Sequence, residues 1–465
     1  MTTISTSATP PRTPAARAPW LLAVLLAGQF MAILDVSIVN VAAPVIRSDL
    51  GASGSVLQMV VSGYTVAYAM LLISGARLGG RYGGRRLFLA GLLLFTAASL
   101  ACGLAPSAGW LVAFRLLQGA GAALMVPQVL SMIQTSFTGA ARARALSLYA
   151  AVISGAAIAG QVLGGVLVSA DLLGGGWRPV FLVNVPLGLV LLAVGARLLP
   201  SGHPGSRAGL RFLDLPGLVT LSAAVGLLVV PLVLGPEQGW PRWGWAAMAG
   251  GALLLVAFAL VERRAAAPLV PARVLGAPGV LPSALAVFGV MATYGGFLFS
   301  LALHLQGPLG DGPLEAGLTF LPAAGAFAAA SLTWRRVPER LHRRMIVVSF
   351  AVAALGYLGL AGALGGGGHG QPLLAVALAV TGLGLAGAFS PVLSLVLTHV
   401  APADAAEASG LFVMVTQLGQ VVGVATFGTF YLAQGSAAGT GAALAAAALA
   451  TGACALPLLR VRRAR

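Results

Sequence analysis

An aspartate and an arginine, Asp35 and Arg115, are the residues of this sequence whose types and positions could carry chemistry. Asp35 lies in the apolar segment 20–46, which holds no other charge. A helix needs about 20 apolar residues to cross a membrane, and a carboxylate near its centre costs about 2.5–3.5 kcal/mol on insertion scales. Because such a residue is usually retained for function and can accept a proton, Asp35 indicates a membrane protein that handles protons.

Arg115 is the matching basic residue, in segment 110–135. At 1.5 Å per residue, Asp35 lies about 22 Å from the start of its helix, and Arg115 about 8 Å from the start of a helix that runs the opposite way. In a hydrocarbon core about 30 Å thick, both side chains then lie at a similar depth. We expect an ion pair that protonation of Asp35 would break, and the alternative is a static structural ion pair.

The composition of the whole chain agrees with a membrane protein. Hydrophobic residues make up 58% of it, charged residues 8%, and the mean hydropathy is +0.96, whereas soluble proteins are about a quarter charged. The net charge is +16, but the placement of the arginines argues against nucleic acid as a partner. Cys102 and Cys454 lie in apolar runs, and no nucleophile–base or metal cluster appears. We therefore expect no enzyme activity, no cofactor, no metal site and no disulfide.

Apolar segments separated by Gly, Pro and Arg clusters predict fourteen membrane spans. The expected spans are residues 20–46, 56–76, 86–105, 110–135, 145–170, 179–199, 212–234, 243–262, 279–304, 314–334, 344–364, 371–399, 405–431 and 437–458. Since the number is even, both termini lie on one side of the membrane.

The arginines orient these spans, because all 27 basic residues are arginine. Twenty-three lie in the two tails and in the loops on the same side as the tails. Three lie in loops on the other side (Arg47, Arg178 and Arg242), and Arg115 lies within a span. Cytoplasmic loops carry the excess of basic residues. We expect a multi-pass protein of the cytoplasmic (inner) membrane, with both termini in the cytoplasm.

A stripe of small residues marks the fifth expected span. Gly160, Gly164 and Gly165 allow a neighbouring helix to approach closely. Such a stripe most often serves plain helix packing, and it could also form a surface that slides during a conformational cycle. Beside it, Gln161 is a polar candidate for contact with a substrate.

Two further polar residues could line a cavity. Gln118 lies three residues after Arg115 and shares its helix face. Tyr294 lies about 15 residues into the ninth expected span, near the depth of Asp35. We take both as candidates for substrate binding, and an ordinary core role is an equal alternative for Tyr294.

Five motifs in chain order resemble one known family. They are Leu34–Pro44 in the first span, Arg115–Gly119 in the fourth, Trp177–Gly188 after the fifth, and Leu305–Pro322 and Ala408–Ala425 in the second half. On these motifs, which extend over most of the chain, the sequence resembles the fourteen-helix drug:proton antiporters of the major facilitator superfamily.

A further stretch, Leu78–Arg86, resembles the superfamily's cytoplasmic gating loop. The residues that this resemblance assigns to gating are Gly80, Arg81, Gly83 and Arg85. The sequence departs from the family pattern in two places. In the loop, Gly80 stands where the family has Asp and Gly84 where it has a basic residue, and in the fifth span Gln161 stands where the antiporter motif has Pro. The first removes an acid that helps to latch the two halves in the family. The second should leave the helix straighter and adds a polar group that needs a partner.

The resemblance implies an all-α fold of two six-helix bundles, related by pseudo-symmetry, with two inserted helices. The expected parts are a cytoplasmic tail (1–19), an N-terminal bundle (20–199), a linker with two extra spans (200–278), a C-terminal bundle (279–458) and a second tail (459–465). The substrate site would lie near mid-membrane between the bundles.

The expected function is proton-coupled efflux of a lipophilic, drug-like or antibiotic small molecule by alternating access. The expected partners are this substrate, protons as the coupling ion and membrane lipids, and we expect a monomer. A dedicated exporter of one endogenous metabolite, lipid or peptide is the alternative within transport. A non-transporting receptor or scaffold is the rival from another class, and connections of at most about twenty residues disfavour it.

The arginine distribution predicts that both tails are cytoplasmic. In a chain lacking Cys102 and Cys454, a cysteine introduced into either tail should react with a membrane-impermeant thiol reagent only after the cells are opened. Labelling of a tail from outside intact cells would overturn the orientation.

Overall fold

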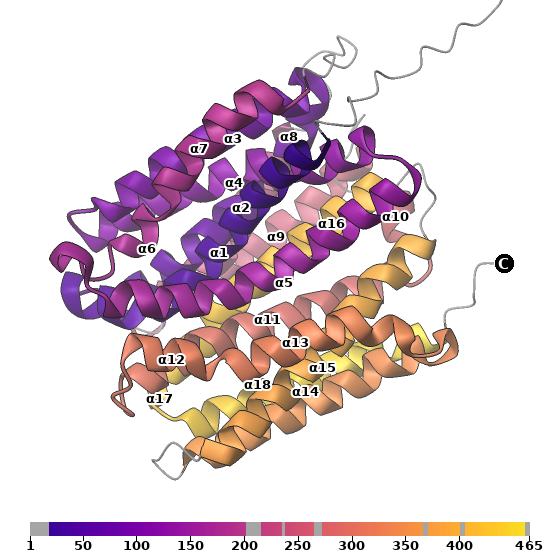
Figure 1. Cartoon of the computed structure of the whole chain (residues 1–465). Coiled ribbons are helices and arrows are strands. Elements are labelled where there is room, and N and C mark those ends of the chain that lie inside the picture. The colour runs from indigo at the N-terminus through magenta and orange to yellow at the C-terminus, as the bar shows by residue number, and fades with distance from the viewer. Residues whose placement is uncertain are drawn as a thin grey trace, which may run out of the picture.

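The computed structural model consists almost entirely of helices. It describes residues 18–200, 215–234, 238–264, 272–365, 371–399 and 405–460, and no β-strand occurs within these ranges. Most of both expected tails lies outside the described residues. Figure 1 shows the long helices running side by side in two groups that follow each other along the chain.

The first group holds the residues expected in the first six spans. Its helices are α1 (Ala18–Leu50), α2 (Gly54–Tyr82), α3 (Gly84–Gly103), α4 (Ala108–Ser136), α5 (Gly139–Ser169), α6 (Pro179–Leu182) and α7 (Asn184–Leu198). Only one residue separates α6 from α7, and together they form one apolar run.

The rest of the chain forms two connecting helices and the second group. The connecting helices are α8 (Leu215–Leu234) and α9 (Arg242–Arg264), and α8 packs against both α9 and α2. The second group comprises α10 (Ala272–Leu275), α11 (Val280–Gln306), α12 (Pro313–Thr319), α13 (Leu321–Thr333), α14 (His342–Gly365), α15 (Gln371–His399), α16 (Ala405–Gly423), α17 (Thr429–Gln434) and α18 (Ala437–Ala455). A π-helical turn, Val424–Gly428, joins α16 to α17. The residue boundaries of the expected bundles and linker stay predictions.

Twelve helices in the described residues are long and apolar enough to cross a membrane. This count does not confirm the predicted fourteen. The two remaining expected spans correspond to α5 and α8. Within the described residues, their apolar helices are the shorter segments Ala159–Ser169 and Val219–Leu228.

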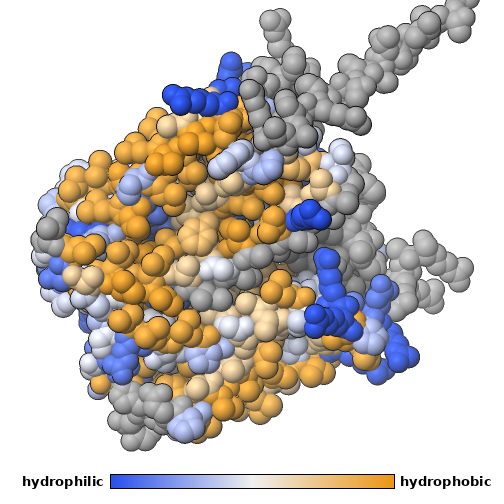
Figure 2. All heavy atoms as spheres, in the orientation of Figure 1, coloured by the Kyte–Doolittle hydropathy of each residue, from blue (hydrophilic) through white to orange (hydrophobic). Residues whose placement is uncertain are grey.

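Figure 2 shows hydrophobic residues over most of the visible face, with hydrophilic residues gathered toward the helix ends. A surface in contact with lipid has this distribution.

Glycines bring α2 and α4 into close contact. A Cβ at Gly75 on α2 would lie 1.9 Å from the carbonyl oxygen of Ala123, and a Cβ at Gly119 on α4 would lie 2.2 Å from the carbonyl oxygen of Tyr64. Both distances are far shorter than van der Waals contact, so only glycine permits this spacing. The close approach of α2 and α4 helps to hold α4, which carries Arg115, within reach of Asp35 on α1.

The two groups are hydrogen-bonded to each other near the end of the molecule at which α1 finishes and α2 begins, here called the joined end. Hydrogen bonds among the described residues cross between the groups there. Gln306 Nε2 donates to the Val41 carbonyl (2.9 Å), and the Leu314 amide donates to Ser169 Oγ (3.1 Å). The Gln58 side-chain amide is paired with Thr429 Oγ1 (3.1 Å from Nε2 and 3.3 Å from Oε1). Opening a passage between the groups at this end requires these contacts to break.

The α2–α4 contact predicts a strong effect of adding one methyl group. Gly75→Ala should destabilise the protein by about 1–3 kcal/mol, because the new Cβ overlaps backbone atoms that cannot move aside cheaply. Gly325→Ala on α13 is the matched control, since a Cβ there meets nothing within 4 Å. Thermal unfolding in detergent should show a lower midpoint for Gly75→Ala alone, and equal midpoints for the two variants would contradict this account of the packing.

Candidate functional site

Asp35 and Arg115 form a salt bridge inside the first group. The Arg115 guanidinium donates through Nη1 to Oδ2 of Asp35, and both side chains are fully buried. The structure thus brings together the two charges that the helix geometry placed at one depth. Opposite charges excluded from water interact more strongly than at a surface, and each makes burial of the other less costly.

Two side-chain amides also donate hydrogen bonds to the Asp35 carboxylate. Oδ1 accepts from Gln118 Nε2 at 2.6 Å and from Asn184 Nδ2 at 3.1 Å. Gln118 also donates to Ser99 Oγ at 2.8 Å and accepts from Arg115 Nη1 at 2.7 Å. The carboxylate is therefore held by hydrogen-bond donors from α4 and α7.

Arg115 has partners besides the carboxylate. Its Nε donates to the Val60 carbonyl at 3.0 Å, and its guanidinium carbon lies 4.8 Å from the ring centroid of Tyr64 and 5.7 Å from that of Phe181. Aromatic faces attract cations, and more so away from water. These contacts would retain the guanidinium in place when Asp35 is neutral.

Close helix packing brings Asn184 to the site. Asn184 is the first residue of α7, and one turn later a Cβ at Gly188 would lie 2.0 Å from Thr96 Oγ1 on α3. Glycine at position 188 lets α7 lie directly on α3, so the amide at its start reaches α1. Asn184 belongs to the motif Trp177–Gly188, so the sequence pointed to it. No pattern in the sequence pointed to Tyr64, which contacts Arg115.

A cavity lies between the two groups, next to this site. Its volume is about 20 Å³, and it is lined by Val36, Asn40, Val61, Ser62, Thr65, Tyr294, Gly295, Leu298, Gln420, Val421 and Val424. The lining comes from α1 and α2 on one side, and from α11, α16 and the π-helical turn on the other. It contains no charged residue, and the buried Ser62 Oγ has no hydrogen-bond partner.

The three candidates for substrate contact fall in different places. Tyr294 lines the cavity. Gln118 does not, because its amide is buried in the ion-pair network. Gln161 is 3% exposed on α5, and neither polar atom of its side chain has a partner.

The glycine stripe of α5 faces two neighbours. A Cβ at Gly160 would lie 2.6 Å from Ser37 Cβ, and one at Gly164 would lie 3.0 Å from the Ile38 carbonyl oxygen, so these two glycines bring α5 onto α1. Gly165 instead faces the second group, with its Cβ position 2.7 Å from Leu314 Cα.

The expected gating loop is a tight junction between α2 and α3. Gly83 joins them at φ = 93°, a conformation that favours glycine. Arg85 donates to the Ala196 carbonyl on α7, and the Arg81 guanidinium lies 5.2 Å from the Tyr82 ring centroid. A Cβ at position 80 would meet nothing within 4 Å.

The buried ion pair predicts unequal effects of single and double substitutions. Arg115→Met should destabilise the protein by about 3–5 kcal/mol, because it leaves the Asp35 carboxylate buried without its cation. Combining it with Asp35→Asn should restore most of the thermal stability in detergent. Arg178→Met, which breaks the exposed pair with Asp49, should cost no more than about 1 kcal/mol. A double variant as unstable as Arg115→Met would contradict this explanation.

Curated relatives of this chain include transporters and resistance proteins. A "Probable actinorhodin transporter" from Streptomyces coelicolor is 37% identical over 433 residues, which is 92% of this chain and 74% of the relative. "Cephamycin export protein CmcT" from Amycolatopsis lactamdurans is 40% identical over 415 residues, 85% of this chain and 81% of the relative. "Puromycin resistance protein pur8" from Streptomyces alboniger is 37% identical over 419 residues, which is 88% of this chain and 81% of the relative.

The fold is shared with solved transporters of low sequence identity. The crystal structure of an auto-inhibited POT family peptide transporter has a TM-score of 0.68 at 14% identity, covering 96% of this chain and 98% of that one. The sequence pattern of the Major Facilitator Superfamily matches residues 25–424 and 283–465. The chain therefore belongs to the Major Facilitator Superfamily, and it is a membrane transporter rather than an enzyme.

Proposed function

We propose that this protein exports lipophilic, drug-like or antibiotic small molecules in exchange for protons. The observation that carries the proposal is the Asp35 carboxylate, which is fully buried and held by Arg115, Gln118 and Asn184. A group that can titrate, placed in a span at a cost, is suited to accept and release a proton.

Protonation of Asp35 changes the forces on α1. The neutral carboxyl group no longer attracts Arg115, and its oxygens become weaker acceptors for the two amides. Because Asp35 joins α1 to α4 and α7, loss of the charge loosens α1 from both helices. Val36 and Asn40 on α1 line the cavity between the groups. A proton on Asp35 would thus alter the substrate cavity through the helix, without touching the substrate.

The contacts between the two groups support a mechanism of alternating access. A cavity of about 20 Å³ holds little more than a water molecule, so binding a drug-sized molecule requires the groups to move apart. Their hydrogen bonds at the joined end close that side. Breaking these contacts while contacts form at the opposite end would expose the cavity to each side in turn.

The cavity lining supports recognition of the substrate without charged side chains. Its polar groups are hydroxyls and amides (Asn40, Ser62, Thr65, Tyr294 and Gln420), and the remaining lining is aliphatic or glycine. Such a lining suits a lipophilic molecule that carries hydroxyl or carbonyl groups. Tyr294 would contact the substrate directly, Gln161 would do so when the groups separate, and Gln118 would act by positioning Asp35.

The names of the relatives support antibiotic efflux, since they include a puromycin resistance protein. They also favour the alternative, a dedicated exporter of one endogenous metabolite, because others are named as an actinorhodin transporter and a cephamycin export protein. Transport of many unrelated compounds would favour multidrug efflux, and transport of one would favour the alternative.

In this proposal, α5 and α8 complete fourteen membrane crossings, and both termini are cytoplasmic. The joined end is then the outer side. The protein works as a monomer in the cytoplasmic membrane, without a cofactor. Each proton that enters supplies about 2.3 kcal/mol per 100 mV of membrane potential.

Asp35→Asn tests the proton coupling. Asparagine resembles the protonated carboxyl group but cannot titrate, so uptake of lipophilic antibiotics into inside-out proteoliposomes should no longer respond to a pH gradient. Downhill movement of substrate should persist. Asp49→Asn is the control, because that carboxylate is exposed and pairs with Arg178 at the joined end. If Asp35→Asn still concentrates an antibiotic when a pH gradient is applied, the coupling assigned to Asp35 is wrong.

A further inference from the structure

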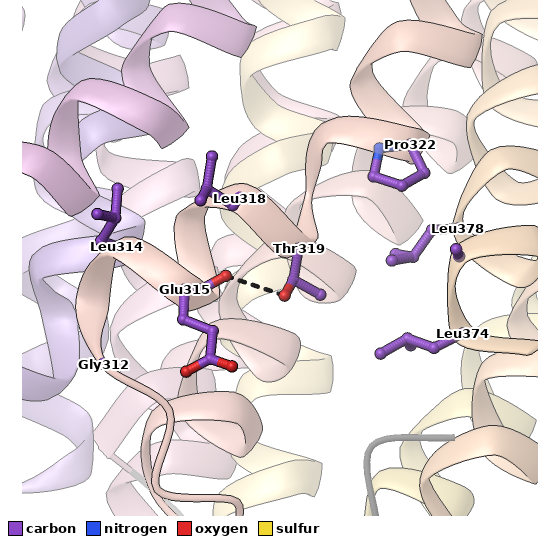
Figure 3. Close-up of a pocket in the computed structure, with 9 residues that line it drawn as sticks. Gly312, Leu314, Glu315, Leu318, Thr319, Pro322, Leu374 and Leu378 are labelled. Carbon is purple, nitrogen blue, oxygen red and sulfur yellow. Dashed lines mark hydrogen bonds between the residues drawn. The ribbon is translucent and has the colours of Figure 1, made fainter. Parts of the chain in front are cut away.

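A groove opens on the second group, outside the cavity between the groups. It has a volume of about 520 Å³ and lies between α12 and α15, at the joined end. It is lined by Gly312, Leu314, Glu315, Leu318, Thr319, Pro322, Leu374, Ala375 and Leu378. Figure 3 shows the leucines and Glu315 on α12 and α15, and Pro322 on α13.

Pro322 creates the groove by breaking one helix into two. Proline lacks the amide hydrogen that would bond to the Leu318 carbonyl, and its ring collides with that carbonyl in a straight helix. α12 accordingly ends at Thr319, and α13 begins at Leu321 in a different direction.

The two pieces differ in their contact with α15, although both lie against α5. α13 lies against α15, where a Cβ at Gly382 would be 2.0 Å from the Ala323 carbonyl oxygen. α12 packs against α5 of the first group without this contact to α15: a Cβ at Gly317 would be 2.6 Å from the Gln161 carbonyl oxygen, and the Leu314 amide donates to Ser169. The space that α12 leaves beside α15 is the groove, so the groove is open while α12 rests on α5.

The groove combines apolar walls with one carboxylate. Leu314, Leu318, Leu374 and Leu378 supply the walls. The Glu315 side chain is exposed, and no salt bridge to it is found among the described residues. A positive charge next to an apolar body is the ligand chemistry that matches this pair of features.

We propose that the groove binds a lipophilic monocation, with its charge at Glu315 and its apolar body among the leucines. Occupancy fills the space into which α12 would move and therefore holds α12 on α5, with the joined end closed. The groove suits a compact molecule better than a phospholipid, because α12 is only about 10 Å long and one leaflet is about 15 Å thick. The proposal does not depend on proton-coupled efflux.

Site-specific protection tests the binding in purified protein. In a chain carrying Cys102→Ala and Cys454→Ala, the single variant Leu318→Cys would be labelled with N-ethylmaleimide in detergent. Tetraphenylphosphonium should slow this labelling, and tetraphenylborate, which has the same shape and the opposite charge, should not. Leu355→Cys on the exposed face of α14 reports non-specific partitioning, and its labelling should be the same with both ions.

Glu315→Gln decides whether the carboxylate is responsible. This variant should weaken protection by tetraphenylphosphonium about fivefold, the upper range for an exposed ion pair. Glu339→Gln, an exposed glutamate outside the groove, should leave protection unchanged. Equal protection by the two ions, or full protection in Glu315→Gln, would overturn the proposed site.

Spin labels test the effect on α12. One label at Leu172→Cys, shortly after α5, and one at Pro308→Cys, in the segment between α11 and α12, should show a larger fraction of short distances when tetraphenylphosphonium is present. Glu315→Gln should lose this response. Protection of Leu318→Cys without a change in the distances would overturn the claim that occupancy holds α12 on α5. Because neither measurement uses transport, failure here is distinguishable from failure of proton-coupled efflux.

Discussion

The burial of Asp35 and Arg115 away from water is the constraint on which the first group depends. Neither charge is stable there alone, so α1 and α4 must approach until the two side chains meet. That approach depends on α4 resting on α2 through glycine, with the Gly119 Cβ position 2.2 Å from the Tyr64 carbonyl oxygen. The remaining oxygen of the carboxylate requires donors as well, and Asn184 reaches it because Gly188 lets α7 lie on α3.

The same arrangement connects the buried charge to the space between the groups. α1 carries Asp35 on the side that faces α4 and α7, and it carries Val36 and Asn40 on the side that faces the cavity. A change in the charge of Asp35 would therefore act on α1, which contacts both the buried ion-pair network and the cavity between the groups. In the proposed mechanism, this separation would allow a proton to influence an uncharged cavity. It also distinguishes Gln118, which holds the carboxylate, from Tyr294, which lines the cavity.

At the joined end, a single proline decides how the second group meets the first. Pro322 ends the close contact with α15 and directs α12 toward α5. The closure between the groups and the groove behind it are two results of one bend. Gly165 and Gly317 allow this contact to form between backbones, so it contains few long side chains that would resist separation.

The sequence by itself determined the membrane class and the charged pair, because apolar length and a rare intramembrane charge are local signals. The segment containing Asp35 and the opposite run of the segment containing Arg115 were enough to predict their similar depth. Only the tertiary structure showed that Asn184 and Gln118 share the carboxylate, that Gly165 faces α12 while Gly160 faces α1, and that α12 parts from α15. Helical periodicity gives the face on which a residue lies, but which neighbour covers that face depends on how distant helices pack, and no local pattern encodes that choice.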